Sequence, residues 1–219
     1  SFPLPMEGQP LANVKVSGSL TDSLTGKPFT GIVSIIDVDE GVEVAPKYLK
    51  PDGSFEFDLV NNRNYLLVIQ GDEFFRIEEM FYLDGPTRLD RMTEPIASRV
   101  KFESIEFDNG ASELKTEMYA DLNKIINFMY DNPDFRLKIS GHTDSSGGEE
   151  INLRLSKERA QTIRDYIVIF GGIYPERVDY DGFGSSQPIV KEVTEEDRSL
   201  NRRVEFIIYR PAPPVNENN

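Results

Sequence analysis

Cysteine is absent from the 219 residues, and His142 is the only histidine. Without cysteine, this sequence can form no disulfide, no cysteine-ligated metal site and no lipidated cysteine. A single histidine cannot build a zinc site without cysteines, and carboxylates alone suit harder ions. We therefore expect no metal and no cofactor, and we expect His142 to be a structural residue that orients its loop.

Long apolar runs are also missing. No segment approaches the ~18 apolar residues that a membrane-spanning helix needs. The first five residues, Ser1 to Pro5, lack the basic start and apolar core of a signal peptide. The sequence therefore predicts no membrane span and suggests a mature form or a fragment of a longer protein.

Positive charge is scarce throughout, because the net charge is -14. Residues 1–95 carry 16 acids and 8 bases, and residues 96–219 carry 22 acids and 16 bases. Binding to a polyanion would need a basic stripe, and we find none. Nucleic acid is therefore excluded as an expected partner.

Residues 13–83 read as a series of short strands separated by turn signals. Residues 32–38 are rich in β-branched side chains, and residues 55–59 alternate between apolar and polar. Regularly spaced strands without a convincing helix predict an all-β sandwich domain. We expect residues 1–12 to be an extended lead-in and residues 84–98 to be a linker.

An aromatic-rich run closes this predicted domain. It consists of Phe74, Phe75, Ile77, Phe81, Tyr82 and Leu83. Packing in the core and strands of the sandwich is the expected role. A partner-binding patch is the alternative.

Residues 99–210 combine helical and strand patterns, which predicts an α+β domain with helices packed on one face of a mixed sheet. We expect an opening strand through Val100, Phe102, Ile105 and Phe107, and a final strand through Val204, Phe206 and Ile208. Residues 211–219 are expected to form a tail.

Two helices are predicted in this domain. The first is capped by Ser112, and its apolar stripe is Leu114, Met118, Leu122, Ile125, Ile126 and Met129. The second has Leu155, Ala160, Ile163, Ile167 and Phe170 at helical spacing and ends at Gly171-Gly172.

The polar segment from Gly141 to Gly148 joins a predicted strand to the second helix, a place from which a rigid scaffold can present side chains. Asp144 lies in this loop, and Asn152, Ser156 and Arg159 share one helix face. A carboxylate at one end of a groove and a guanidinium at the other suit a zwitterion. Two other roles are open: Asp144 in an Asx-turn or helix cap, and Arg159 as a surface ion-pair partner.

Several separated blocks in this half resemble a known family. The first block is Gly141, His142, Thr143, Asp144, Gly147, Asn152, Leu155, Ser156, Arg159 and Ala160. Later blocks are Gly182, Gly184, Pro188 and Ile189, and then Asn201, Arg202, Arg203 and Val204. Together they resemble the OmpA-like peptidoglycan-binding domain, over about Val100 to Tyr209.

The resemblance implies a ligand, the diaminopimelate side chain of peptidoglycan. Asp144 would hold its ammonium group and Arg159 its carboxylate. The other implied contacts are Asn152 and Leu153 at the groove wall, Arg202, Thr143 and Asn109. The family usually has Gly-Arg-Ala where this chain has Asp197, Arg198 and Ser199, and Asn where it has Glu192, so affinity or peptide preference is in question.

Residues 13–83 also resemble the carboxypeptidase regulatory-like domain. The matching positions are Val16, Gly18, Leu20, Asp22, Thr25, Gly26, Lys27 and Pro28, followed by Asp52, Gly53, Ser54, Phe55 and Tyr65. The two resemblances imply a periplasmic protein attached to the outer membrane by an anchor outside this sequence. The implied function is non-covalent anchoring to the cell wall.

A scaffold role in an envelope-spanning complex such as a secretion system is the alternative, with wall binding secondary. The tandem arrangement is similar to that of cell-wall-anchored lipoproteins of secretion systems, and the sandwich would contact other envelope proteins. We expect no enzyme. Neighbouring acids such as Glu149 and Glu150 usually form a solvated face, and no nucleophile elbow or phosphate-binding glycine loop is present.

Overall fold

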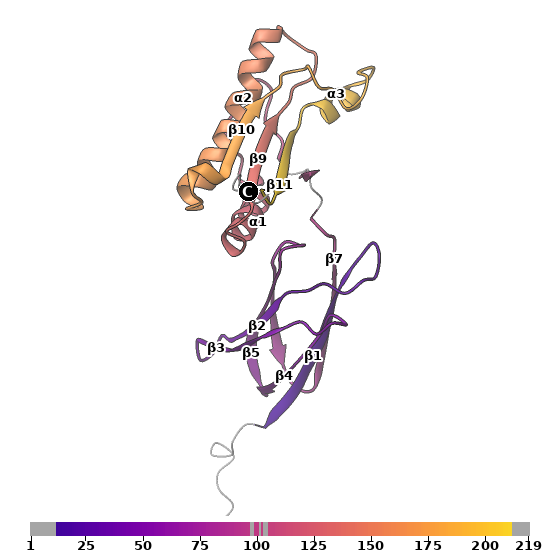
Figure 1. Cartoon of the computed structure of the whole chain (residues 1–219), viewed down its shortest axis with the longest axis vertical. Coiled ribbons are helices and arrows are strands. Elements are labelled where there is room, and N and C mark those ends of the chain that lie inside the picture. Colours follow the sequence, from indigo (N-terminus) through magenta and orange to yellow (C-terminus); the bar gives the residue numbers. More distant parts are fainter. Residues whose placement is uncertain (1–11, 97–98, 101, 103–104, 212–219) are drawn as a thin grey trace, which may run out of the picture. The chain divides into compact units, whose positions relative to one another are not determined.

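A computed structural model of the protein describes residues 12–96, 99–100, 102 and 105–211 (Figure 1). The predicted lead-in at residues 1–12 falls outside these residues except for Ala12, and the predicted tail falls outside them except for Pro211. The chain divides into two compact units, residues 1–95 and residues 96–219. Among the described residues, none of the helices combines the length and the apolar character needed to cross a membrane.

The N-terminal unit is all β and contains two sheets. Its strands are β1 (Asn13–Asp22), β2 (Ile32–Asp37), β3 (Val42–Tyr48), β4 (Ser54–Val60), β5 (Arg63–Gln70), β6 (Ile77–Leu83) and β7 (Thr87–Thr93). One sheet has the order β4-β1-β7 and the other β3-β2-β5-β6. All pairs are antiparallel except β1 with β7, which run parallel.

Both sheets contribute to one hydrophobic cluster. The predicted alternation in β4 is confirmed, since Phe55, Phe57 and Leu59 are buried while the residues between them are not. In β5, the buried residue Tyr65 donates its hydroxyl hydrogen to the carbonyl of Val60 at 2.8 Å. Period-two burial of this kind follows when one face of each sheet covers a common core.

The linker predicted at residues 84–98 is wrong in part, because β7 lies within it. Thr87–Thr93 pairs with β1, and Leu89 is buried in the core. The sequence did not predict this strand because Leu89 is its only buried position. With polar residues such as Arg88 and Asp90 on either side, the alternation of apolar and polar residues cannot be recognised.

The aromatic-rich run lies mostly in the core, as predicted. Phe74 and Leu83 are fully buried, whereas Tyr82 is 56% exposed on β6, as is its neighbour Met80. β6 is an edge strand of its sheet, so these two side chains remain on an open surface.

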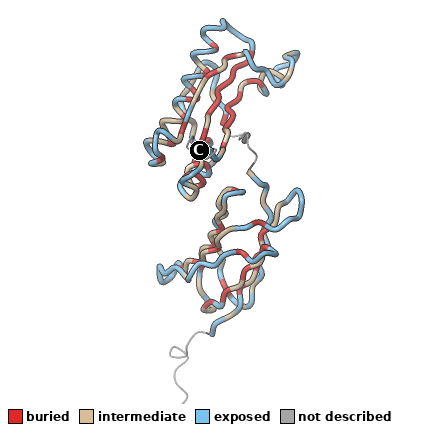
Figure 2. Tube along the Cα trace, in the orientation of Figure 1, coloured by how far each residue is buried: buried red, intermediate tan, exposed pale blue. Residues whose placement is uncertain are grey.

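The C-terminal unit contains a four-stranded mixed sheet and three α-helices. Its elements are β8 (Arg99–Val100), α1 (Met118–Asp131), β9 (Arg136–Gly141), α2 (Glu149–Asp165), β10 (Val178–Gly182), α3 (Glu195–Asn201) and β11 (Val204–Tyr209). The strand order is β10-β9-β11-β8, with β9 parallel to β10 and antiparallel to β11. Buried residues run along the strands of this sheet (Figure 2).

The opening strand is shorter than predicted. β8 comprises Arg99–Val100, paired with β11, and residues 105–108 form no strand. Part of the predicted strand, at residues 101, 103 and 104, lies outside the described residues. Ile105 is nevertheless buried, so its apolar side chain serves the core without strand pairing.

Helix α1 begins later than predicted. Its N-cap is Glu117, not Ser112, and Leu114 lies before the helix. The buried face is Met118, Leu122, Ile125, Phe128 and Met129, which confirms most of the predicted stripe. The N-cap was predicted too early because the sequence of residues 112–117 is compatible with a helix, although these residues form none.

Helix α2 packs against β9 and β10, and glycines make this close packing possible. A Cβ atom on Gly141 would lie 2.1 Å from the carbonyl oxygen of Ser156, and one on Gly182 would lie 2.3 Å from the amide nitrogen of Lys157. Any larger residue would push the helix away from the sheet. The glycines thus fix the distance between α2 and the loop that follows β9.

The end of α2 departs from the prediction. A π-helical turn, Tyr166–Phe170, follows the helix before Gly171. Ile167 is buried as predicted, but Phe170 is 78% exposed. The wider turn changes the angular spacing of side chains, so the 3.6-residue stripe does not continue to Phe170.

Candidate functional site

The predicted site residues converge where β9 ends and α2 begins. Residues 142–144 continue from β9, and Thr143 donates its backbone N–H to the carbonyl of Gly184 at 2.9 Å. Gly184 has φ +53°, and a Cβ there would lie 3.0 Å from the amide nitrogen of Leu153. The loop is therefore held between the turn after β10 and the first turns of α2.

Asp144 is a buried carboxylate with a cationic partner. Arg202 Nη1 donates to Asp144 Oδ2 at 2.7 Å, and the backbone N–H of Ser146 donates to Oδ1 at 2.9 Å. Burial alone raises the pKa of Asp144, but these hydrogen bonds outweigh it and hold the pKa below its ordinary value. Asp144 thus forms the Asx-turn and also carries a negative charge that another cation could use.

Arg159 is not a surface ion-pair partner. It is 4% exposed, and its Nε and Nη2 donate to the carbonyls of Ala111 and Asp108 at 2.8 and 2.9 Å. Its guanidinium carbon lies 5.2 Å from the ring centre of Phe107. Burial, followed by the nearby charge of Arg202, lowers the pKa of Arg159 from its ordinary value. The two guanidinium groups therefore lie within electrostatic reach of each other.

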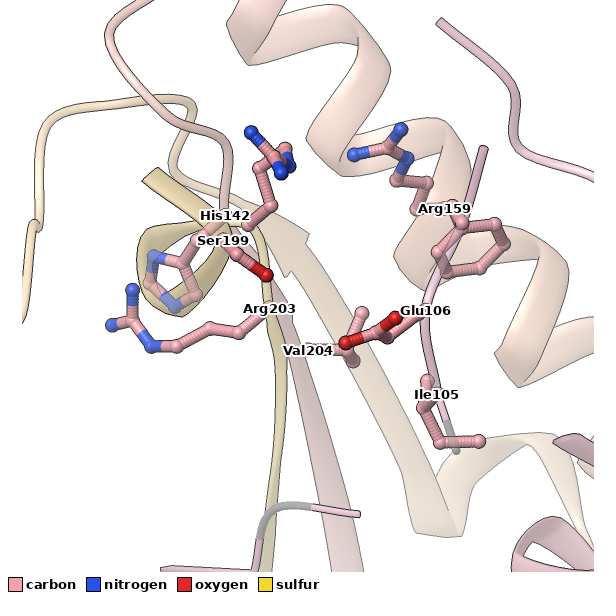
Figure 3. Close-up of a pocket in the computed structure, with 9 residues that line it drawn as sticks. Ile105, Glu106, His142, Arg159, Ser199, Arg203 and Val204 are labelled. Carbon is pink, nitrogen blue, oxygen red and sulfur yellow. The ribbon is translucent and has the colours of Figure 1, made fainter. Parts of the chain in front are cut away.

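A cavity of about 80 Å³ lies between these cations. Its lining is Ile105, Glu106, Phe107, His142, Arg159, Ser199, Arg202, Arg203 and Val204. Figure 3 shows Arg159 on one side, Ser199 on the other, and Ile105 and Glu106 below them. One water takes about 30 Å³ in the liquid, so a carboxylate group fits this space. Three arginines and one acidic residue, Glu106, line the cavity, and this excess of positive charge favours an anion.

Arg202 connects the cavity to Asp144 and to α3. Its Nη2 donates to Glu195 Oε1 at 2.8 Å, while its Nη1 holds Asp144. Arg203, by contrast, is buried and donates to Glu205 Oε1 at 2.8 Å. Arg203 is therefore paired internally, and it also lines the cavity.

The remaining predicted residues take different places. Asn152 is buried, and its amide donates to the carbonyls of Asp144 and Ser146, so it supports the loop from below. Leu153 is 50% exposed and lines a neighbouring hollow with Gly147 and Phe183. Thr143 is buried, and within the described residues its hydroxyl has no hydrogen-bond partner.

Asn109 is exposed at the tip of a turn that Arg159 holds. The carbonyls of Asp108 and Ala111, on either side of this turn, are the two that accept from Arg159. Its turn therefore lies next to the cavity, although no contact of its side chain defines a role.

His142 packs as a structural residue. Its ring stacks on Phe183 with centroids 5.4 Å apart, and its Nε2 lies 4.0 Å from Glu205 Oε2. Across the described ranges, no group of three or more histidine, cysteine or acidic residues is placed to hold a metal ion.

Sequence analysis did not place two acidic residues in the site, since Glu195 was not singled out and Glu192 was noted only as a departure from the family pattern. Glu195 begins α3, and Glu192 accepts hydrogen bonds from Ser145 and Asn201. The available signal was the capping box, in which Thr194 and Asp197 satisfy each other's backbone N–H groups. It predicts a helix start at Thr194, and Arg202 then follows Glu195 by seven residues, two turns along the same face.

Known proteins resemble the C-terminal part of the chain. Residues 106–202 match the model of the OmpA family. Outer membrane porin F of Pseudomonas aeruginosa is 39% identical over 108 residues, which is 49% of this chain and 31% of that protein. Peptidoglycan-binding protein ArfA of Mycobacterium tuberculosis is 38% identical over 104 residues, 48% of this chain and 32% of that protein.

Solved structures align with part of the chain. A peptidoglycan-associated lipoprotein from Burkholderia pseudomallei aligns with TM-score 0.44 and 23% identity, covering 51% of this chain and 89% of that one. This chain spans about a third of the length of the two curated relatives. The family match and the identities to the curated relatives fall on the same half of the chain: residues 106–202 are similar in sequence to the OmpA family.

Proposed function

We propose that the OmpA-like domain binds peptidoglycan non-covalently through the diaminopimelate side chain of its peptide. The observation that carries the proposal is the ion pair of Asp144 with Arg202, which lines a small cavity together with Arg159. The relative named peptidoglycan-binding protein ArfA, 38% identical over this region, supports the same class of ligand.

The ligand would bind by its two charged ends. Its ammonium would hydrogen-bond to the Asp144 carboxylate. It would either share this carboxylate with Arg202 or displace Arg202 from it. Its carboxylate would enter the cavity between Arg159 and Arg202, where both charges stabilise it. Each charge-assisted hydrogen bond contributes about 1.5–3 kcal/mol. After ordering costs, this predicts a binding free energy of about -4 to -8 kcal/mol, in the millimolar to micromolar range.

Weak individual contacts suit anchoring. A membrane-attached protein faces a repeating polymer, so effective concentration raises its occupancy without new contacts. We propose that this chain belongs to a periplasmic protein tied to the outer membrane, and that its role is binding rather than catalysis.

Sedimentation with purified sacculi tests the proposal. The wild-type chain should pellet with diaminopimelate-containing sacculi, and Asp144→Asn should remain largely in the supernatant. Equal pelleting of the two would count against the proposed site, and absence of the wild type from the pellet would count against wall binding itself.

The N-terminal unit supports a second candidate role. We propose that it is a carboxypeptidase regulatory-like β-sandwich that contacts another envelope protein. The exposed side chains of Met80 and Tyr82 on edge strand β6 favour this scaffold function. Cross-linking in the native envelope from position 78, an exposed residue of β6, should capture a defined partner that the double variant Met80→Ala, Tyr82→Ala loses. Unchanged capture by that variant would reject this surface.

A further inference from the structure

Glu192 lies at the centre of a hydrogen-bonded bridge beside the site. Its carboxylate accepts from the backbone N–H of Ser145 at 3.0 and 3.1 Å, from the Ser145 hydroxyl, and from Asn201 Nδ2 at 2.9 Å. Ser145 follows Asp144 in the chain, and Asn201 precedes Arg202. One side chain therefore joins the immediate neighbours of both members of the ion pair.

The bridge is anchored on a buried residue. Asn201 is fully buried, and its Oδ1 accepts from the backbone N–H groups of Ile189 and Val190 at 2.9 and 3.2 Å. Its Nδ2 also donates to the carbonyl of Val190 at 2.9 Å. Asn201 cannot turn away without losing these bonds, so Glu192 is tied to a fixed point of the fold.

We infer that Glu192 is a positioning residue of the ligand site, which sets the placement of Asp144 relative to Arg202. The inference rests on the proposed function. If Ser145 is released, the loop can move and the Asp144 carboxylate loses its orientation toward Arg202. A displacement of about 1 Å is enough to weaken charge-assisted hydrogen bonds substantially.

The hydrogen bonds of Glu192 distinguish a positioning residue from an ordinary surface charge. A solvated rim carboxylate contributes little to its neighbours. Glu192 instead receives several hydrogen bonds from two elements, and the bonds from Ser145 hold its pKa below the ordinary value, so it is ionised at neutral pH. Glu196 provides the contrast: it lies on α3, it is exposed, and it carries the same charge.

The test is calorimetric titration of four full-length proteins with a diaminopimelate-containing muropeptide: wild type, Glu192→Ala, Glu192→Gln and Glu196→Gln. Glu192→Ala should weaken binding about tenfold, the equivalent of one hydrogen bond. Glu192→Gln should recover most of the affinity, because its amide can accept from Ser145 and Asn201. Glu196→Gln, which removes the same charge, should bind like the wild type.

Amide hydrogen exchange in the ligand-free proteins supplies the second readout. Exchange at Ser145 should accelerate in Glu192→Ala and return toward the wild-type rate in Glu192→Gln. Wild-type affinity in Glu192→Ala would overturn the inference alone, as would equal weakening in Glu192→Gln and Glu196→Gln. No binding by the wild type would overturn the proposed function and this inference with it.

Discussion

Arg202 donates a 2.7 Å hydrogen bond to the carboxylate of Asp144, although the two residues are 58 positions apart in the sequence. In the ligand-free protein, the carboxylate proposed to bind an ammonium group therefore already holds a cation. Arg202 is also bonded to Glu195, so it retains a partner when the ligand takes Asp144. The ion pair keeps the buried charge compensated before the ligand arrives.

Removal of Arg202 should raise the pKa of Asp144. Burial already acts in that direction, and the Arg202 hydrogen bond is the largest influence opposing it. We expect an upward shift in Arg202→Gln, measured by NMR titration of the side-chain carboxyl carbon. Arg198→Gln is the control, because Arg198 donates to Glu195 and not to Asp144. Equal shifts in both variants would contradict a specific role for Arg202.

The stability contributed by Asp144 should disappear in acid. Because its pKa is lower in the folded protein than in the unfolded chain, the unfolded chain binds more protons between the two values. The contribution is complete above the unfolded pKa of about 4 and is lost as the pH falls through the folded pKa. Urea denaturation of wild type and Asp144→Asn at pH 7, 4 and 3 measures this. The difference in unfolding free energy should narrow below about pH 4, and a constant difference would refute the assignment.

Arg159 should matter for stability as well as for binding. Arg159→Ala leaves the carbonyls of Asp108 and Ala111 without their donor and should lower the unfolding free energy by about 2 kcal/mol or more. Arg159→Lys keeps the charge but lacks the planar fork that reaches both carbonyls, so it should be intermediate. Arg154→Ala is the matched control on the same helix, since its side chain is 72% exposed. If denaturant unfolding shows that Arg154→Ala and Arg159→Ala lower the unfolding free energy equally, this role of Arg159 is contradicted.

Gly141 should tolerate no side chain. In Gly141→Ala the added Cβ would meet the carbonyl oxygen of Ser156 at 2.1 Å, which displaces α2 and costs about 1–3 kcal/mol. Gly85→Ala, where the Cβ meets nothing within 4 Å, should unfold within about 0.5 kcal/mol of the wild type. Thermal denaturation checks the pair. A wild-type midpoint for Gly141→Ala would show that α2 does not approach β9 this closely.

The strand β7 should be required by the N-terminal unit. A fragment of residues 12–95 retains the parallel pairing with β1 and the buried Leu89. A fragment of residues 12–84 exposes that edge of β1, so it should be less stable or unfolded. Circular dichroism and urea denaturation of the two fragments measure the difference. Equal stability of the two fragments would mean that the N-terminal unit does not need β7 and would support the prediction that residues 84–98 are a linker.

Sequence patterns predicted the framework of the C-terminal unit well. The buried faces of α1 and α2 follow helical periodicity, although the first part of the α2 face is polar, with Asn152, Ser156 and Arg159 buried. The stripe failed at Phe170, where a π-helical turn changes the side-chain spacing that periodicity assumes. Strand β7 failed for a related reason, since a single buried leucine carries no readable period.

Sequence analysis named candidate site residues, but it did not predict the contacts that these residues make in the structure. Asp144 and Arg159 were identified as a pair, yet Asp144 bonds to Arg202 and Arg159 bonds to backbone carbonyls. Pairing between residues far apart in the chain depends on how the loops pack, which no local pattern specifies. Glu192 was seen only as a departure from the family, because its bridge to Ser145 and Asn201 exists only in three dimensions.

Calorimetric titration with a diaminopimelate-containing muropeptide tests the central claim most directly, with wild type, Asp144→Asn and Arg159→Lys compared. We expect wild-type binding in the micromolar to millimolar range, at least about tenfold weaker binding by each variant, and weaker binding of a lysine-type peptide. Circular dichroism should show that both variants remain folded. No heat from the wild type at millimolar ligand, or equal affinity in all three proteins, would contradict the account.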